Sequence, residues 1–240
     1  MPISTVLSAT AERRLVLSHY APGEACRAHR HGEAQRSLLL AGCYVETSEE
    51  GRREVEGRTL SVKPPRFEHE DTFGVAGALI LSAQGTEGGI SADRYRLSPG
   101  ASPHAVQMMM EDSFAGDGAT VEGTGAEAEA NGETPVPHWL HEARRRLMEQ
   151  PGMPIASLAR SMDRHPVHLA RQFRAAFGRP PSQVRQDGRT ARAIGRIVRS
   201  PLSLADIAFA EGFSDQAHMT RVVHRVSGWT PGGLRRVLPR

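Results

Sequence analysis

The sequence predicts an α+β chain in which a strand-rich N-terminal region precedes an all-α C-terminal region. In the first hundred residues the apolar residues form short runs or alternate with polar ones, which is typical of strands. After Pro137 they recur at helical spacing, and between the two regions the composition shifts to Gly, Ala, Glu and Thr. We therefore expect a β-barrel over residues 1–102, an interdomain helix and linker over 103–137, and a helical domain over 138–240.

The strand-rich region contains four segments that are short and apolar or alternating. Turn signals separate them at Pro22-Gly23, Glu50-Gly51 and Pro64-Pro65. Short strands at this spacing predict a barrel or a sandwich. The segments are Arg14–Tyr20, Ser37–Thr47, Thr59–Val62 and Ala78–Gln84.

The connecting region contains one segment that favours a helix. Pro103–Phe114 carries Met108, Met109 and Met110, which we expect to pack in a core or between domains, because methionine adapts to irregular gaps. Gly116–Pro137 has almost no large apolar residue and is interpreted as a linker, with a weak helix over Thr124–Ala130.

The C-terminal region predicts two short helix pairs joined by a long helix. His138–Gln150 leads into the first pair. Ser182 is the expected N-cap of the long helix, which ends near Arg199. In each pair a helix of about eight residues, a tight turn and a helix of about twelve form a helix-turn-helix unit, whose second helix lies in the major groove of DNA. The pairs are Ile155–Met162 with Pro166–Phe177, and Ser203–Glu211 with Ser214–Ser227.

Charge and cysteine content restrict the functional classes. Residues 138–240 carry 18 arginines, no lysine and seven acidic residues, a net charge of +11, whereas the other residues have a net charge of −8. A basic half is attracted to phosphate, although charge alone is equally consistent with an arginine-rich soluble domain. Only Cys26 and Cys43 are present, and no signal sequence or membrane span is recognised, so we expect a cytoplasmic protein with reduced thiols.

The C-terminal region resembles the AraC-type bacterial transcription regulators. The similarity lies in Ile207-Ala208, in the run from Gly212 to Arg221, in Gly228-Trp229-Thr230-Pro231 and in Arg235-Arg236. The first unit is similar from Leu158 to Pro181. Val223 departs from the family, which usually has an aromatic residue there, and so does Gly195 in the long helix. The resemblance implies two recognition helices that enter successive major grooves of one DNA duplex.

Ten residues are our candidates for contacting DNA. Arginine pairs with guanine and glutamine with adenine, and Val167 suits a thymine methyl group. Arg174, Arg225 and also Arg235 are expected to contact phosphates, which position the protein without reading the sequence. The ten candidates are His165, Val167, His168, Arg171 and Arg174 in the first unit, and Asp215, Gln216, His218, Arg221 and Arg225 in the second.

The strand-rich region resembles the cupin barrels, because His29, His31 and Gln35 follow the spacing of the first cupin motif and His69 that of the second. Gln35 replaces the usual Glu, and Arg66 a usual Gly. Residues two apart on a strand point the same way, so His29 and His31 would face the interior. Three imidazoles and one oxygen suit one divalent transition metal such as Zn, Fe, Ni or Cu. The alternative is a metal-free pocket for an organic effector.

The sequence thus predicts a non-enzymatic transcription regulator, an activator by family resemblance, that binds double-stranded DNA and responds to a metal or small molecule in its barrel. The resemblance also implies RNA polymerase as a partner and allows a homodimer formed through the barrel. A metal-dependent cupin enzyme of the dioxygenase kind, fused to a DNA-binding domain, is the alternative.

Overall fold

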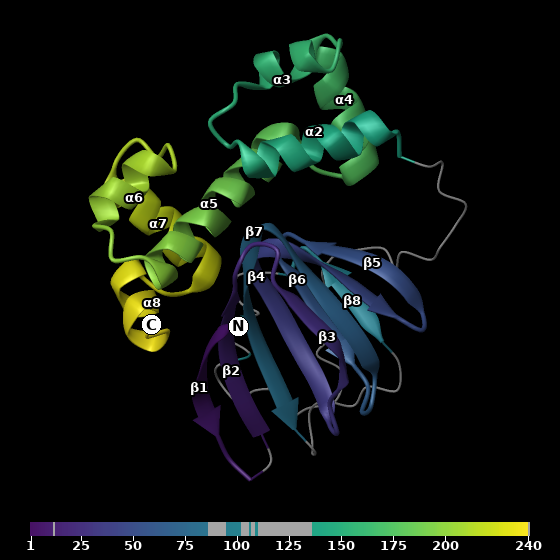
Figure 1. Cartoon of the computed structure of the whole chain (residues 1–240), viewed down its shortest axis with the longest axis vertical. Helices are drawn as coiled ribbons and strands as arrows, with labels where there is room; N and C mark the ends of the chain where they lie inside the picture. The colour runs from purple at the N-terminus through teal and green to yellow at the C-terminus, as the bar shows by residue number, and fades with distance from the viewer. Residues whose placement is uncertain (12, 86–94, 102–105, 107–108, 110–135, 240) are drawn as a thin grey trace.

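The structure, a computed structural model, describes residues 1–11, 13–85, 95–101, 106, 109 and 136–239 (Figure 1). The predicted class is confirmed: a β-barrel precedes a helical region that contains two helix-turn-helix units. The expected helix over Pro103–Phe114 and the linker lie mostly outside the described residues. Val106 and Met109 are described, and both are buried in the core. Among the described residues no helix is both long enough and apolar enough to cross a membrane.

Within the described residues one antiparallel sheet forms the N-terminal region. Its order is β1-β2-β7-β4-β6-β8, while β3 pairs with β7 and β5 pairs with β4. The strands are β1 (Ile3–Ala9), β2 (Arg13–Tyr20), β3 (Ala25–Arg30), β4 (Ala34–Ser48), β5 (Gly51–Glu56), β6 (Thr59–Lys63), β7 (Glu68–Gly85) and β8 (Arg96–Pro99).

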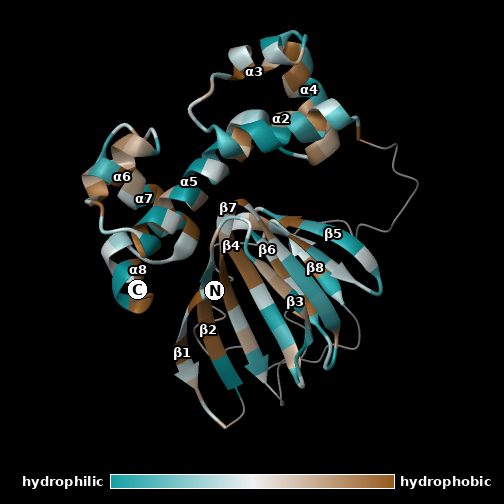
Figure 2. Cartoon of the chain, in the orientation of Figure 1, coloured by the Kyte–Doolittle hydropathy of each residue, from teal (hydrophilic) through white to brown (hydrophobic). Residues whose placement is uncertain are grey.

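Strands β4 and β7 are the long central pair, and both of their faces are buried. Leu39 and Ile80 belong to a core inside the barrel, whereas Leu38, Leu79 and Leu81 belong to a second core on the opposite face. This double burial explains the continuous apolar runs that the sequence shows there. Figure 2 shows the hydrophobic residues along the central strands.

Six of the described helices lie where the sequence predicts them, whereas the last one, over Pro231–Val237, was not predicted. The helices are α2 (His138–Glu149), α3 (Ile155–Ser161), α4 (Pro166–Phe177), α5 (Pro181–Arg199), α6 (Leu204–Ala210), α7 (Gln216–Ser227) and α8 (Pro231–Val237). The predicted cap of the long helix is wrong. Pro180 is the N-cap of α5, and Pro181 opens the first turn, where its missing N–H costs nothing.

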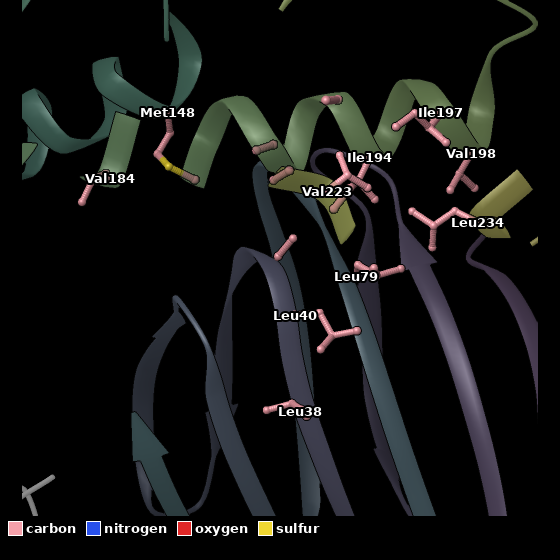
Figure 3. Packing of buried hydrophobic residues seen from close by; sticks show 14 of the residues in the cluster. Leu38, Leu40, Leu79, Met148, Val184, Ile194, Ile197, Val198, Val223 and Leu234 are labelled. Atoms are coloured by element: carbon pink, nitrogen blue, oxygen red, sulfur yellow. The ribbon is translucent and has the colours of Figure 1, made fainter. Parts of the chain in front are cut away.

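Helix α5 joins the two regions. Ile194, Ile197 and Val198 of α5 share one hydrophobic cluster with Leu38 and Leu79 of the sheet (Figure 3). The unexpected Gly195 has its explanation here, because a Cβ on it would lie 3.3 Å from Nε2 of His19, a buried residue of β2. A glycine therefore allows the helix to approach the barrel closely.

Candidate functional site

The second helices of the two helix-turn-helix units correspond residue by residue. Helices α4 and α7 each have twelve residues and begin 50 positions apart, and each ends at a glycine in the left-handed region, Gly178 and Gly228. The buried residues Leu169 and Phe173 of α4 correspond to Met219 and Val223 of α7. Val223 is fully buried, so the smaller residue still occupies the core position.

The first predicted contact residue of each unit is also the N-cap of its helix. Nδ1 of His165 accepts a hydrogen bond from the backbone N–H of Val167. In the second unit an Asp215 carboxylate oxygen accepts from the backbone N–H of His218 at 2.6 Å, and this bond lowers the pKa of the Asp215 carboxyl. Sequence reasoning did not identify these two capping roles, which fix where each recognition helix begins.

The other predicted residues lie on the solvent side of their helices. Val167 has 70% of its surface exposed. His168 and His218 are half-buried, and His218 is held at Nδ1 by Ser214 at 3.0 Å. The exposed members are Val167, Arg171 and Arg174 of α4 and Gln216, Arg221 and Arg225 of α7.

The arginines of the helical region divide into two groups. Those of α2 and α5 are engaged within the fold: Arg144 pairs with Glu54 and Glu56 of the barrel, and Arg192 and Arg196 pair with Glu211. Arg235, expected at a phosphate, instead donates to the carbonyl of Ile197 at 3.0 Å. The side chains of the four arginines on the recognition helices form no ion pair within the described part of the chain. These four, Arg171, Arg174, Arg221 and Arg225, leave a fixed positive surface on α4 and α7.

The barrel interior brings three of the four predicted metal ligands together. His29 of β3 lies directly opposite His69 of β7, and their ring centroids are 4.4 Å apart. His31 lies 5.1 Å from His29 and 5.6 Å from His69, again between centroids. One donor atom from each imidazole lies within 4.8 Å of the other two. The structure thus brings together the three histidines that the sequence spacing singled out.

Each of these imidazoles is oriented through the same ring nitrogen. Nδ1 of His29 bonds to the carbonyl of Arg27 at 2.8 Å, and Nδ1 of His69 bonds to that of Phe67 at 3.3 Å. The amide nitrogen of Gln84 donates to Nδ1 of His31 at 3.0 Å. Donation from Nδ1 to a carbonyl leaves Nε2 of His29 and of His69 as the ligating atom.

The environment keeps the imidazoles of His31 and His69 uncharged. Burial is the main cause that lowers the pKa of His69 to about 3 and that of His31 to about 4. A neutral imidazole is the form that binds a metal, so both rings are ready to ligate at neutral pH. The residues therefore fit a divalent transition metal.

Gln35 is placed differently from the histidines. It is 7% exposed, it lies opposite Lys63 of β6 and Gln84 of β7, and its Oε1 has no hydrogen-bond partner. A buried carbonyl oxygen without a donor is costly, which makes it a candidate ligand. Sequence reasoning missed three charged neighbours in the same interior, Glu46, Lys63 and Asp71. The sequence contains a single lysine, Lys63, and this rarity could have marked it as a candidate site residue.

A second hollow lies between the barrel and the helical region. Its volume is about 550 Å³, and it is lined by Arg58 and Leu97 on one side and by Phe177, Arg179 and Gln183 on the other. Arg58 also donates to the carbonyl of Val226, at the end of α7, at 3.2 Å. Any occupant of this hollow would contact both regions of the chain.

Comparison with known proteins identifies the helical region. Residues 158–237 match a family described as a helix-turn-helix domain. The HTH-type transcriptional regulator GlxA of Rhizobium meliloti is 38% identical over 80 residues, which are 33% of this chain and 25% of that protein. The chain thus spans about a quarter of the length of this curated relative. The helix-turn-helix domain expected from the AraC-type resemblance is confirmed over residues 158–237.

Solved structures share parts of the fold at low identity. ToxT from Vibrio cholerae has a TM-score of 0.41 and 8% identity over 95% of this chain and 100% of that chain. A cupin superfamily protein from Desulfitobacterium hafniense has a TM-score of 0.34 and 16% identity over 36% of this chain and 79% of that chain.

Proposed function

We propose that this chain is a sequence-specific DNA-binding transcription regulator whose barrel senses a divalent metal or a small molecule. The observation that carries the proposal is the pair of equivalent helices, α4 and α7, whose arginines form no ion pair within the described part of the chain, whereas the arginines of α2 and α5 are used within the fold. Arg171 and Arg221 occupy the same position in the two helices. Each can form two hydrogen bonds to a guanine edge in the major groove.

The base-reading role of Arg221 is the sharpest test. We expect Arg221→Ala to weaken binding to a selected operator by about 1–3 kcal/mol, because a bidentate contact to one base is lost, and to relax preference at one base position. Operator selection followed by fluorescence anisotropy on operator and random DNA measures both effects. Arg52→Ala, which removes an equal charge from an exposed site on β5, is the matched control. An equal loss on operator and random DNA would contradict base reading.

The sensing role is assigned to the interior histidines. When bound, a divalent ion would join β3 to β7 through His29, His31 and His69 and would supply positive charge to the barrel interior. Elemental mass spectrometry of the full chain, beside a His29→Ala/His31→Ala variant, tests this. A content of about one metal ion per wild-type chain, lost in the variant, supports metal sensing. If the wild type holds no metal even after reconstitution, the remaining candidate for the barrel is an organic effector.

Helix α5 offers the route from the barrel to DNA. It packs on the sheet through Ile194 and Ile197, and it carries the two units at its ends (Figures 1 and 3). An effector changes DNA affinity only if it binds the DNA-competent arrangement with a different affinity from the other arrangement. Operator affinity measured with and without the metal therefore tests this coupling. RNA polymerase and a second copy of the chain are further partners that the AraC-type resemblance implies.

One observation favours the enzymatic alternative. Asp71 places a carboxylate 3.7 Å from Nε2 of His69, and histidines with one carboxylate are the ligands of non-haem iron oxygenases. Iron-dependent oxygen consumption with an oxidisable substrate would support an enzyme, whereas operator binding modulated by the metal without turnover supports the regulator.

A further inference from the structure

The interior histidines are part of a larger polar cluster that has two sets of donor atoms. His29, His31 and His69 form one set, and Glu46, His69 and Asp71 form the other. In each set, one donor atom per residue lies within 4.8 Å of the others. His69 belongs to both, so the imidazoles and the carboxylates are continuous around it.

The strand register explains why these residues meet. Asp71 follows His69 by two positions on β7, so their side chains share one face of the sheet. Glu46 of β4 lies directly opposite Asp71, and His29 of β3 lies directly opposite His69. The Asp71 carboxylate therefore enters the interior from the strand that carries His69, and the Glu46 carboxylate enters from the neighbouring strand β4.

The charges in this cluster do not balance. The Glu46 carboxylate is buried and lies 2.5 Å from Nζ of Lys63, so these two charges compensate each other. The Asp71 carboxylate lies 3.7 Å from Nε2 of His69, and within the described residues its Oδ1 has no hydrogen-bond partner. A largely buried carboxylate oxygen that lacks a partner is costly unless a cation binds it.

The distance between Asp71 and His69 suits two ligands of one ion. A metal binds nitrogen and oxygen at about 2.0–2.2 Å each, so two donors of one tetrahedral ion lie roughly 3.3–3.6 Å apart. Asp71 Oδ2 and His69 Nε2 are 3.7 Å apart, and small side-chain rotations close the difference. Gln35, by contrast, supplies a neutral carbonyl oxygen and lies opposite Lys63.

We infer that Asp71 of β7 supplies the anionic ligand of a three-histidine divalent metal site, in place of the residue at position 35 of β4. The inference rests on the metal-sensing part of the proposed function. The negative charge that a Glu at position 35 would bring is thus supplied by another strand, beside His69. The site takes a borderline divalent ion that accepts imidazole and carboxylate together, and Co²⁺ is its spectroscopic probe.

The test is titration of the metal-free full-length protein with Co²⁺ alone, followed by visible absorption and calorimetry. We expect one Co²⁺ per wild-type chain. Asp71→Asn, which keeps the shape of the side chain and removes its charge, should lower the affinity at least tenfold and change the Co²⁺ absorption. Glu70→Gln is the matched control, because Glu70 is the exposed neighbouring carboxylate on β7 and its loss should change neither.

A stability measurement separates a ligand from a merely structural residue. Without metal, Asp71→Asn should melt at the same or a higher temperature than wild type, because the variant lacks an uncompensated buried charge. Co²⁺ should raise the melting temperature of wild type and have a much smaller effect on the variant.

Two outcomes overturn the inference. If Asp71→Asn binds Co²⁺ as wild type does while His29→Ala/His31→Ala does not, the histidine site stands and Asp71 is not its ligand. If wild type itself binds no Co²⁺, the metal site fails altogether, whereas DNA binding, measured separately by anisotropy, is unaffected.

Discussion

The turn inside each helix-turn-helix unit depends on one residue with a positive φ. Gly212 has a φ of 71° in the second unit, and Asp163 has a φ of 52° at the equivalent place in the first. The following residues make the same hydrogen bond, from Arg164 N to Ala159 O and from Phe213 N to Ala208 O, each at 2.9 Å. Both turns therefore need a left-handed residue, and only the second has glycine.

These two turn residues give opposite predictions. Gly212→Ala should lower the free energy of unfolding by about 1 kcal/mol, because a Cβ disfavours the left-handed region although the space around it is open. Asp163→Gly should leave stability unchanged or raise it by a few tenths of a kcal/mol. Urea unfolding of both variants beside wild type measures the difference. A stable Gly212→Ala would show that the turn can adopt another backbone geometry.

At the residue scale, the sequence shows the spacing of candidate ligands better than it shows which side chains pair with one another. His29 and His31 were found because residues two apart on a strand point to the same face of the sheet. Asp71 was not found, although it stands in the same relation to His69, because its meaning depends on Lys63 being paired with Glu46. That pairing depends on the register of β4, β6 and β7, which includes bulges that the sequence does not reveal.

At the scale of elements, the second unit is fixed to α5 through a buried carboxylate. Glu211, at the end of α6, has a fully buried side chain and accepts a hydrogen bond from Arg192 at 2.8 Å and another from Arg196. Since both arginines come from α5, the pair sets the position of α6 relative to that helix. The orientation of α7, which packs on α6, follows from it.

Removing this carboxylate should loosen the second unit. We expect Glu211→Gln to lower the free energy of unfolding by about 1–3 kcal/mol, because two charge-assisted hydrogen bonds are lost while the half-exposed arginines can still turn to water. Thermal and urea unfolding measure the loss. Glu142→Gln on the surface of α2 is the control, and a loss there as large as at Glu211 would show that burial is not the cause.

Element types were easier to predict than element ends. The helices of both units begin within two residues of the predicted positions, because capping residues and terminal glycines mark them. Strand β7 is much longer than the predicted Ala78–Gln84 and begins at Glu68. Its first half is polar because one face carries charged interior residues and the other is exposed to solvent, so the apolar pattern that identifies a strand is absent there.

At the scale of the whole molecule, a buried histidine joins the barrel to α5. His19 of β2 is 1% exposed, and its Nδ1 accepts a hydrogen bond from Nε of Arg199 at 2.9 Å. The other charged group that faces it is Glu24, which lies 3.7 Å from Arg199. Burial first, and then the Arg199 charge, lowers the pKa of His19 to about 4.

This histidine predicts that the native structure loses stability in mild acid. The folded-state pKa of about 4 is below the usual 6.5, so between these values only the unfolded chain takes up the proton. The free energy of unfolding should therefore be unaffected above pH 6.5, and should fall by up to about 3 kcal/mol as the pH decreases to 4. Urea unfolding across this range, beside His19→Asn, which keeps an acceptor for Arg199 without titrating, isolates the contribution. If the free energy of unfolding falls equally with pH in the two proteins, His19 is not the cause of the loss.

On the proposed function, the connection through α5 also restricts the kind of operator that this chain can use. B-DNA rotates by about 34–36° and rises about 3.4 Å with each base pair, since one turn takes 10–10.5 base pairs over about 34–36 Å. Two reading helices held at the ends of one continuous helix cannot follow such a rotation. A half-site moved by a single base pair would be turned by about 34–36° relative to its recognition helix, so the spacing of the two half-sites is part of the operator as well as their bases.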